Sequence, residues 1–187
     1  MSVQKNINIL IIGNTNVNKN LLFDNFVDKT DDNTHDTTHD TTHDKLNTFG
    51  VNFTTKIITE KNKNFKVTLW NTAGQERFKT ITKTFSHRSD AIILVYDTNN
   101  KYSFECVNNW LVNSNLNSKT KILVAISNKD NKDNKDNKDN KVNKSDQNLD
   151  FKGRLLARLF NIPFYELSEK DNSTVLIFFN NLFKILL

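Results

Sequence analysis

The sequence predicts an α/β domain built on a mostly parallel six-stranded sheet with helices on both faces. Strand-like segments alternate with helix-like segments along the chain in the order βαββαβαβαβα, which is typical of mostly parallel sheets. Two of the segments, residues 91–96 and 121–126, are apolar apart from Lys121 at the start of the second, as strands buried on both faces are. The length of 187 residues suits one domain of ordinary size, which we expect to span residues 1–187.

The first half of the chain contains segments with the strand-like and segments with the helical spacing of apolar residues. Residues 5–12 end in an apolar run that stops at Gly13, and residues 17–27 carry apolar side chains at helical spacing. Residues 49–60 and 63–70 are β-branched or alternate between polar and apolar side chains. A short polar turn separates these two segments, so they are predicted to pair as a hairpin.

The second half repeats strand and helix in turn. Each of the two apolar strands is followed by apolar residues at helical spacing, and a short strand precedes a last apolar helix. These elements are expected at residues 101–115, 149–160, 163–167 and 172–186. In a sheet of this kind, ligands bind at the carboxyl ends of the strands.

Two low-complexity insertions interrupt the pattern. Residues 28–47 contain THDTTHDTTHD, and residues 128–142 consist almost entirely of an NKD repeat. Both have almost no apolar side chain to offset their ordering entropy, so we expect mobile insertions looped out of the fold. His35, His39 and His43 would share one helix face and could bind zinc, but their threonine and aspartate neighbours disfavour a helix. Disorder is therefore the preferred interpretation.

Composition narrows the classes of function. The net charge is +5, but the basic residues are scattered and the lysines of the second insertion alternate with aspartate, so no nucleic-acid interface is expected. No apolar run reaches the roughly 18 residues of a membrane span. The start of the chain lacks the features of a signal peptide. The lone Cys106, which we expect in the core, fits the reducing cytoplasm.

A candidate phosphate-binding loop, G-N-T-N-V-N-K-N, lies between the first strand and the first helix. In strand–loop–helix phosphate sites, backbone N–H groups and a lysine surround the phosphates. Lys19 has the place of that lysine, but Asn18 and Asn20 stand where the usual pattern has Gly and Ser or Thr. The predicted binding residues are Gly13, Asn14, Thr15, Asn16, Val17, Asn18, Lys19 and Asn20.

The third strand ends in W-N-T-A-G-Q-E-R-F, residues 70–78, and here the sequence resembles the small GTPases of the Ras superfamily, and among them the Rab family. The resemblance continues in T-F-G-V-N-F, K-V-T-L-W, R-F-K-T-I-T, L-V-Y-D-T and I-P-F-Y-E-L-S-E-K, at residues 48–53, 66–70, 77–82, 94–98 and 162–170. It implies the three-layer P-loop small-GTPase fold, GTP or GDP with Mg²⁺ as ligands, and a nucleotide-dependent switch in vesicle and membrane traffic.

The resemblance also implies roles for individual residues. Thr48 would meet the magnesium ion and the γ-phosphate, and Gly74 would donate its N–H to the γ-phosphate. Gln75 would be the catalytic residue, orienting the water that hydrolyses GTP to GDP. The guanine base would be contacted by Ser168, Glu169 and Lys170.

Four asparagines depart from the family at the phosphates and the metal. Asn16 and Asn18 replace small or glycine residues and risk crowding the phosphates. Asn20 replaces the Ser or Thr that ligates magnesium, and Asn71 replaces the aspartate that holds the ion through its hydration shell. We therefore expect a weak magnesium site at Asn20 and Thr48, reduced nucleotide affinity and slow hydrolysis.

The guanine-reading motif N-K-x-D fits two places. Asn128 and Lys129 lie at the family distance, directly after the fifth strand, but Asn131 takes the place of the aspartate. A full match lies further along the chain, at Asn143, Lys144 and Asp146. Closing the intervening loop costs roughly 2 to 2.5 kcal/mol, which is tolerable. We prefer the second set because its carboxylate selects guanine, and the first set remains the alternative.

The resemblance implies effectors and regulators that dock on switch I and switch II. The insertion at residues 28–47 falls inside switch I, where added length is expected to weaken coupling between the nucleotide and the surface. Without a cysteine near the end of the sequence, we expect no direct lipid anchor, and a monomer brought from the cytoplasm to endomembranes by partners. The alternative is a pseudo-GTPase, a protein-binding module that does not cycle.

Overall fold

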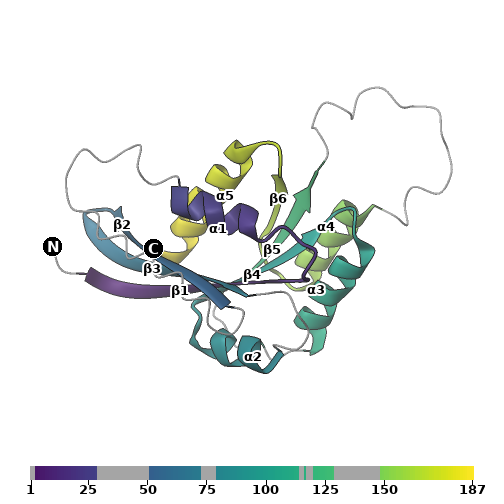
Figure 1. Ribbon diagram of the computed structural model, residues 1–187, viewed down its shortest axis with the longest axis horizontal. Coiled ribbons are helices and arrows are strands. Elements are labelled where there is room, and N and C mark those ends of the chain that lie inside the picture. Colours follow the sequence, from purple (N-terminus) through teal and green to yellow (C-terminus); the bar gives the residue numbers. More distant parts are fainter. Residues whose placement is uncertain (1–2, 29–50, 73–78, 114–115, 117–119, 129–147) are drawn as a thin grey trace.

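The structure, a computed structural model, describes residues 3–28, 51–72, 79–113, 116, 120–128 and 148–187. The elements follow one another in the predicted order (Figure 1). They are β1 (Val3–Gly13), α1 (Asn20–Asp28), β2 (Val51–Glu60), β3 (Lys63–Thr72), α2 (Lys79–Arg88), β4 (Ala91–Asp97), α3 (Lys101–Asn113), β5 (Thr120–Ser127), α4 (Leu149–Leu159), β6 (Phe164–Ser168) and α5 (Asn172–Leu186). Apart from Asp28 and Asn128, the predicted insertions and the three repeat histidines lie outside the described residues.

The strands form one six-stranded sheet in the order β2-β3-β1-β4-β5-β6. Neighbouring strands are parallel except β2 and β3, which are antiparallel. The β2–β3 turn contains Lys61 and Asn62 with φ of 50° and 61°, the left-handed pair that a two-residue hairpin turn requires. The predicted α/β fold class and the predicted hairpin are therefore confirmed.

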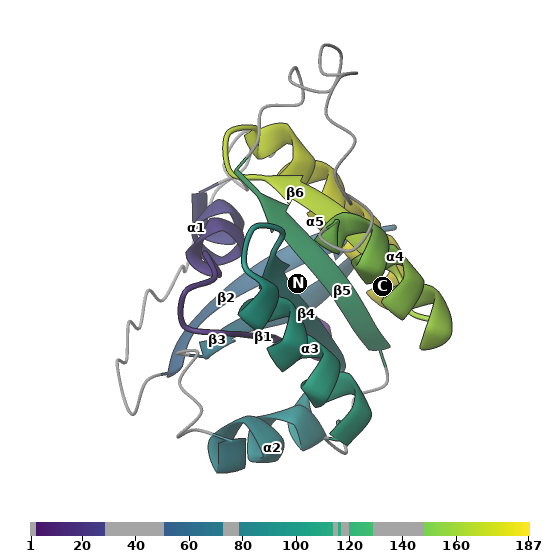
Figure 2. The ribbon, with the colours of Figure 1, turned by 90° about the vertical axis from the view of Figure 1, so that its right-hand side faces the viewer.

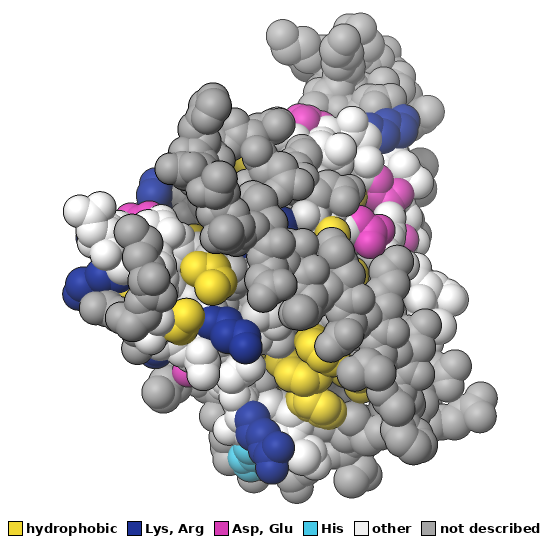
Figure 3. Space-filling view, turned by 60° about the vertical axis from the view of Figure 1, so that its left-hand side comes forward, with side chains coloured by type: hydrophobic (Ala, Val, Ile, Leu, Met, Phe, Trp, Pro, Cys, Tyr) yellow, Lys and Arg dark blue, Asp and Glu magenta, His cyan; other side chains and the backbone are white. Residues whose placement is uncertain are grey.

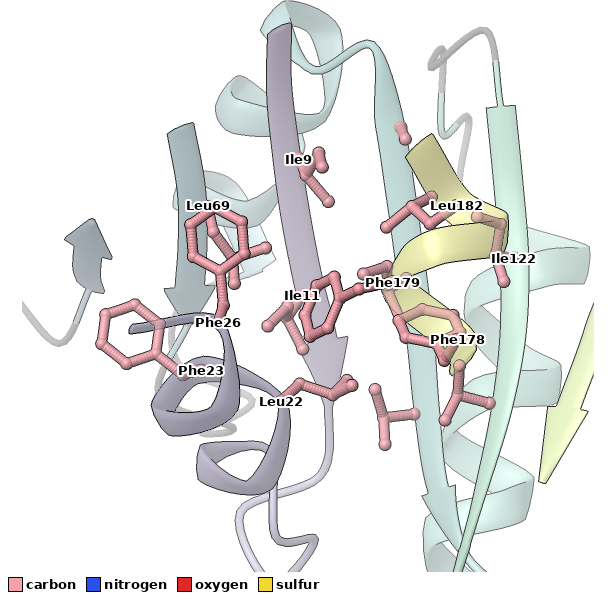
Figure 4. Packing of buried hydrophobic residues seen from close by; sticks show 14 of the residues in the cluster. Ile9, Ile11, Leu22, Phe23, Phe26, Leu69, Ile122, Phe178, Phe179 and Leu182 are labelled. Carbon is pink, nitrogen blue, oxygen red and sulfur yellow. The ribbon is translucent and has the colours of Figure 1, made fainter. Parts of the chain in front are cut away.

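Successive side chains of the central strands point to opposite faces of the sheet, so the hydrophobic core consists of one cluster on each face. On β1, Ile9 and Ile11 belong to the cluster with α1 and α5, whereas Leu10 belongs to the cluster with α3 and α4. Figure 4 shows Phe26 of α1 and Phe179 of α5 over the first face, with ring centroids 5.5 Å apart. Figure 2 shows α3 and α4 on the other face. Within the described parts of the chain, no helix has the length and apolar character needed to cross a membrane.

Helix α1 begins at Asn20 rather than at residue 17, where the apolar spacing placed it. The Oδ1 atom of Asn18 accepts a hydrogen bond from the Leu21 N–H at 3.2 Å, so this side chain caps the helix. Val17 is buried in the loop before the helix and belongs to the same hydrophobic cluster as α1. Its apolar side chain therefore anchors the loop, which the sequence pattern could not separate from the helix.

Helix α4 packs tightly over Tyr96 of β4. The buried phenol donates a hydrogen bond to the Leu149 carbonyl at 3.0 Å, and burial raises the pKa of Tyr96, so the donor stays protonated. Gly153 lies over the same ring, and a Cβ there would be 1.9 Å from Tyr96 Oη. The close approach of α4 to β4 therefore requires glycine at this position.

We expect Gly153→Ala to lower the free energy of unfolding by about 1 to 3 kcal/mol, because the added methyl overlaps the Tyr96 hydroxyl. Adding Tyr96→Phe removes the nearest atom, so the double variant should lose less than the sum of the single losses. Urea unfolding of the four proteins measures the cycle. Strict additivity would show that the two residues do not meet.

Candidate functional site

The parallel strands bring several chain segments to one edge of the sheet. Gly13 ends β1, Asn71 lies near the end of β3, and the pairs Ile11–Asn71 and Ser127–Ser168 align their strands there. The loop of residues 14–19 leaves β1 at this edge and leads into α1 (Figure 1). The predicted site residues that the structure describes therefore gather at one edge, where ligands bind in sheets of this type.

Gly13 lets β1 and β4 come together directly below the loop. A Cβ at this position would lie 2.6 Å from the Val95 carbonyl oxygen, closer than any side chain can stand. The next residue, Asn14, organises the loop: its Oδ1 accepts from the Asn16 N–H at 3.2 Å, and its carbonyl accepts from the Val17 N–H at 3.2 Å. Thr15 and Asn16 are exposed. The hydrogen bonds that Asn14 accepts therefore fix the conformation of the loop.

Asn14 also contacts helix α3. Its Nδ2 lies 3.7 Å from the Sγ of Cys106, in hydrogen-bonding geometry. Cys106 is half-buried rather than part of the core, where the sequence placed it. Nothing in the local pattern of a lone cysteine in a helix could have indicated this contact with the loop.

Lys19 is the central charge of the loop. Only 6% of the residue is exposed, and its Nζ donates to the Asn14 carbonyl at 2.7 Å. Burial lowers the pKa of Lys19 from 10.5 to about 8, so the side chain is still charged at neutral pH. The described residues place no acidic side chain in an ion pair with this buried ammonium, and a bound anion would supply an opposite charge. The loop therefore fits a phosphate.

The backbone of the loop differs from that of a glycine-rich loop. Among the described residues, positive φ at non-glycine positions occurs at Lys61, Asn62 and Asn161, so Asn16 and Asn18 do not use the left-handed region. Asn18 is exposed and caps α1, as described above. The Lys19 N–H donates to the Val17 carbonyl at 2.7 Å. Backbone donors that would surround a phosphate are thus engaged within the loop itself.

Asn20 and Asn71 meet at the position expected for a metal ion. Nδ2 of Asn71 donates to Oδ1 of Asn20 at 3.0 Å. Asn71 is only 6% exposed, and its own Oδ1 is buried with no hydrogen-bond partner among the described residues. Magnesium prefers carboxylate oxygens, and the described residues hold no cluster of three or more His, Cys, Asp or Glu side chains. Two neutral amides, one oxygen of which is already bonded, fit this ion poorly.

The other end of the edge holds the segment predicted to contact a guanine base. The Glu169 N–H donates to the Ser127 carbonyl at 3.0 Å, and the Lys170 N–H donates to Ser168 Oγ at 3.3 Å. Asn128 follows Ser127 and is exposed. The end of β5 and the segment after β6 are therefore fixed to each other beside Asn128.

Several predicted site residues lie outside the described parts of the chain, and their roles stay predictions. They are Thr48, Gly74, Gln75, Lys129, Asn143, Lys144 and Asp146. The two registers of the base-reading motif are therefore not separated by the structure.

A cluster of aromatic rings was not singled out from the sequence. The rings of Phe53 on β2, Trp70 on β3 and Phe85 on α2 contact one another in series at tilted angles, with centroid distances of 4.8 and 4.9 Å. All three side chains are half-buried. Figure 3 shows hydrophobic side chains gathered on the side of the molecule that carries β2 and β3. Partly exposed aromatic rings of this kind are typical of protein-binding surfaces.

A lysine-bearing loop between a buried parallel strand and a helix, at the carboxyl edge of the sheet, defines a P-loop nucleotide-binding protein. Comparison with known families makes the class more specific, because the sequence model of the Ras family matches residues 8–187. The chain belongs to the Ras family and is a divergent small GTPase of the Rab type.

Its relatives include Ras-related protein SEC4 of Candida albicans, 31% identical over 168 residues that cover 89% of this chain and 70% of that protein. SEC4 of Saccharomyces cerevisiae is 32% identical over 181 residues, covering 95% of this chain and 74% of that protein. Ras-related protein RABE1e of Arabidopsis thaliana is 33% identical over 170 residues, covering 90% and 69%. GTP or GDP and Mg²⁺ are the general ligands of this family.

Replacing Lys19 tests whether its buried charge destabilises the folded protein. Lys19→Met should raise the free energy of unfolding of the nucleotide-free protein at pH 7 by about 1 to 3 kcal/mol, because it removes a buried charge. In the wild type the unfolded chain holds this proton up to about pH 10.5 and the folded chain up to about 8, so wild-type stability should rise between these values. The advantage of the variant should shrink across the same window.

Urea unfolding of both proteins from pH 7 to 10.5 measures this difference, and other titrating groups cancel between them. A difference that stays constant with pH would mean that Lys19 keeps an ordinary pKa.

Proposed function

We propose that the chain binds a guanine nucleotide at residues 13–20 and acts as a Rab-like switch in vesicle and membrane traffic. The observation that carries this proposal is the buried ammonium of Lys19, whose pKa is lowered by burial and which forms no ion pair within the described residues. In a P-loop the lysine reaches the β and γ oxygens, so a di- or triphosphate would supply that charge. The Rab-type relatives support guanine as the base and traffic as the process.

Nucleotide binding in this chain is weakened and depends little on magnesium. The Asn20–Asn71 amide pair occupies the position expected for the ion and offers no carboxylate. The loop N–H groups of Val17 and Lys19 are bonded to loop carbonyls, so a phosphate has to displace these bonds. Both features lower the net gain on binding, because existing interactions are exchanged for new ones.

Hydrolysis of GTP to GDP is slow. Gln75 orients the attacking water, and Thr48 and Gly74 meet the γ-phosphate, as in the family that the chain resembles. Because the amide pair holds an ion poorly, the charge that develops on the phosphates rests on Lys19 and on backbone donors. With fewer positive charges to stabilise the transition state, the activation free energy of hydrolysis is higher.

The base is read by Asp146 together with Asn143 and Lys144, on the segment after β5, with Asn128 and Lys129 as the alternative set. Support comes from the edge of the sheet, where Glu169 is bonded to Ser127 and holds the base-contacting segment next to the end of β5.

Effectors and regulators dock on the side that carries β2, β3 and α2. The half-buried ring cluster of Phe53, Trp70 and Phe85 supports this surface, since rigid aromatic side chains give much contact area at little entropy cost. Residues 28–47 and 128–142 are insertions in a single domain of residues 1–187, and the first insertion lengthens switch I. The protein acts as a monomer in the cytoplasm and is brought to endomembranes by these partners.

A pseudo-GTPase is the second candidate, a binding module that keeps the fold without cycling. It is favoured by the same amide pair, which ties the start of α1 to the end of β3 without an ion. In this case the aromatic cluster would bind partners whatever nucleotide is present.

Thermal unfolding with each nucleotide separates the two functions. For a weak switch, GDP and GTP should raise the melting temperature by several degrees at about 100 times Kd, equivalent to about 2.7 kcal/mol, with or without magnesium. ATP should have no effect. No shift with any nucleotide would eliminate the switch and leave the binding module.

Restoring the family's metal ligands tests the cause of the weakness. In the double variant Asn20→Ser with Asn71→Asp, the rise in melting temperature with GDP should become larger and should depend on magnesium. Without nucleotide, the same variant should be less stable than the wild type, because a carboxylate is buried unpaired. The control variant, Asn109→Ser with Asn180→Asp, makes the same chemical changes at two exposed positions. It should change neither the response to GDP and magnesium nor the stability of the nucleotide-free protein. An unchanged magnesium response in the first variant would refute the account given for the amide pair.

The base-reading set is tested by alanine substitution. Asp146→Ala should weaken GDP binding by about tenfold or more, since a charged hydrogen-bond acceptor for the base is lost. Asp139→Ala, in the NKD repeat, is the matched control and should not change the affinity. A loss for Asn128→Ala without a loss for Asp146→Ala would move the motif to the end of β5. Isothermal titration with GDP gives the affinities.

A further inference from the structure

Helix α4 carries apolar side chains on the side that faces away from the sheet. Phe151, Leu155 and Leu159 are 62%, 58% and 77% exposed. Their spacing of four residues places them in one row along the helix. The buried side chains of the same helix are Leu149, Gly153, Leu156 and Ala157. The row is therefore additional to the apolar face that packs on the sheet, and packing within the domain does not account for it.

Basic side chains flank this row. Arg154 and Arg158 follow one border at helical spacing and are exposed, and Lys152 lies toward the other border. Arg154 forms an ion pair with Glu166 at 2.6 Å, whereas Arg158 makes no ion pair within the described residues. The only acidic residue of the helix, Asp150, lies in its first turn. The outward face is thus apolar at its centre and positively charged at its border.

A hollow of about 490 Å³ opens beside the carboxyl end of α4, with Arg154, Arg158, Asn161 and Phe164 in its lining. The Arg154 guanidinium lies over the Phe164 ring, 5.3 Å from its centroid. A guanidinium has five N–H donors, so the ion pair with Glu166 leaves donors for a further acceptor. Two arginines and an amide around an open hollow suit a phosphate group.

We propose that this face of α4 is a docking surface for an anionic phospholipid bilayer. The row of Phe151, Leu155 and Leu159 enters the boundary between headgroups and acyl chains. The guanidinium groups of Arg154 and Arg158 bind lipid phosphates, and one of these phosphates occupies the hollow. An apolar row bordered by basic side chains is the pattern of helices that lie in the membrane interface.

The size of the surface favours a bilayer over a protein. A stable protein interface buries about 800 Å² on each partner, with 20 to 30 residues a side. Three apolar and two or three basic side chains on one convex helix fall short of that. The same groups give the weak, reversible attachment that a single membrane contact provides.

This surface lies apart from the site already described. It includes Phe164, at the start of β6, whereas the candidate nucleotide site includes Ser168 at the other end of that strand. Figure 2 shows α4 at the β5–β6 end of the sheet, away from β2 and β3. Lipid binding therefore does not depend on the nucleotide or on the aromatic cluster. It goes beyond the proposed function by adding a direct membrane contact to recruitment by partners.

Vesicle flotation of the full chain tests the proposal, with phosphatidylcholine vesicles and with vesicles of phosphatidylcholine mixed with phosphatidylserine. We expect binding to the mixed vesicles only. Arg158→Glu should lower the partition coefficient on the order of tenfold or more, because each basic side chain near an anionic surface contributes about fivefold. Leu159→Asp should lower it comparably. Both positions are highly exposed, so the variants should fold, which circular dichroism verifies.

Two matched variants at the opposite end of the sheet are the controls. Lys66→Glu changes the net charge as Arg158→Glu does, and Ile57→Asp alters an apolar side chain that is 60% exposed on β2. Both should bind mixed vesicles as the wild type does. Equal losses in Lys66→Glu would reduce the effect to net charge and overturn the proposal, as would full binding by Leu159→Asp.

Failure of the wild type to bind mixed vesicles at low salt would also overturn it. If the chain instead sediments as a dimer that Leu159→Asp dissociates, the row is an interface between two copies, and the bilayer is excluded as its occupant.

Discussion

The buried ammonium of Lys19 is the interaction on which the candidate site depends. Gly13 allows β1 and β4 to approach directly below it, Val17 fixes the loop in the core, and the Asn14 carbonyl receives one of its protons. A cation held in this way destabilises the empty protein and favours any anion that reaches it. The same buried charge thus lowers the stability of the empty protein and favours an anionic ligand at the loop.

The amide pair of Asn20 and Asn71 is the second constraint. It joins the first residue of α1 to the end of β3 through a neutral hydrogen bond of 3.0 Å, whereas the family joins these elements through an ion. This link joins two neutral side chains directly. A magnesium ion at this position would have to displace that bond. The proposed slow switch and the alternative non-cycling module therefore rest on the same pair of amides.

The sequence predicted the order of the elements because their hydrophobic periods are strong. β4, for example, has no polar residue before its last position, Asp97. It also located Lys19, since a motif fixes position along the chain. It did not predict the bond between Asn14 and Cys106, 92 residues apart, because side-chain contacts across the sheet leave no local pattern. The row on α4 was missed for a different reason: periodicity identifies apolar faces without telling which of them the fold covers.

The start of α4 has a consequence for how this chain changes over generations. The Oδ1 atom of Asn148 accepts hydrogen bonds from the Asp150 and Phe151 N–H groups at 3.1 and 3.3 Å, so the residue directly before α4 caps the helix. Short tandem repeats in a gene gain and lose units by slippage during replication. With β5 complete before the NKD tract and α4 capped independently after it, such copying errors alter the number of units while the domain around them folds as before.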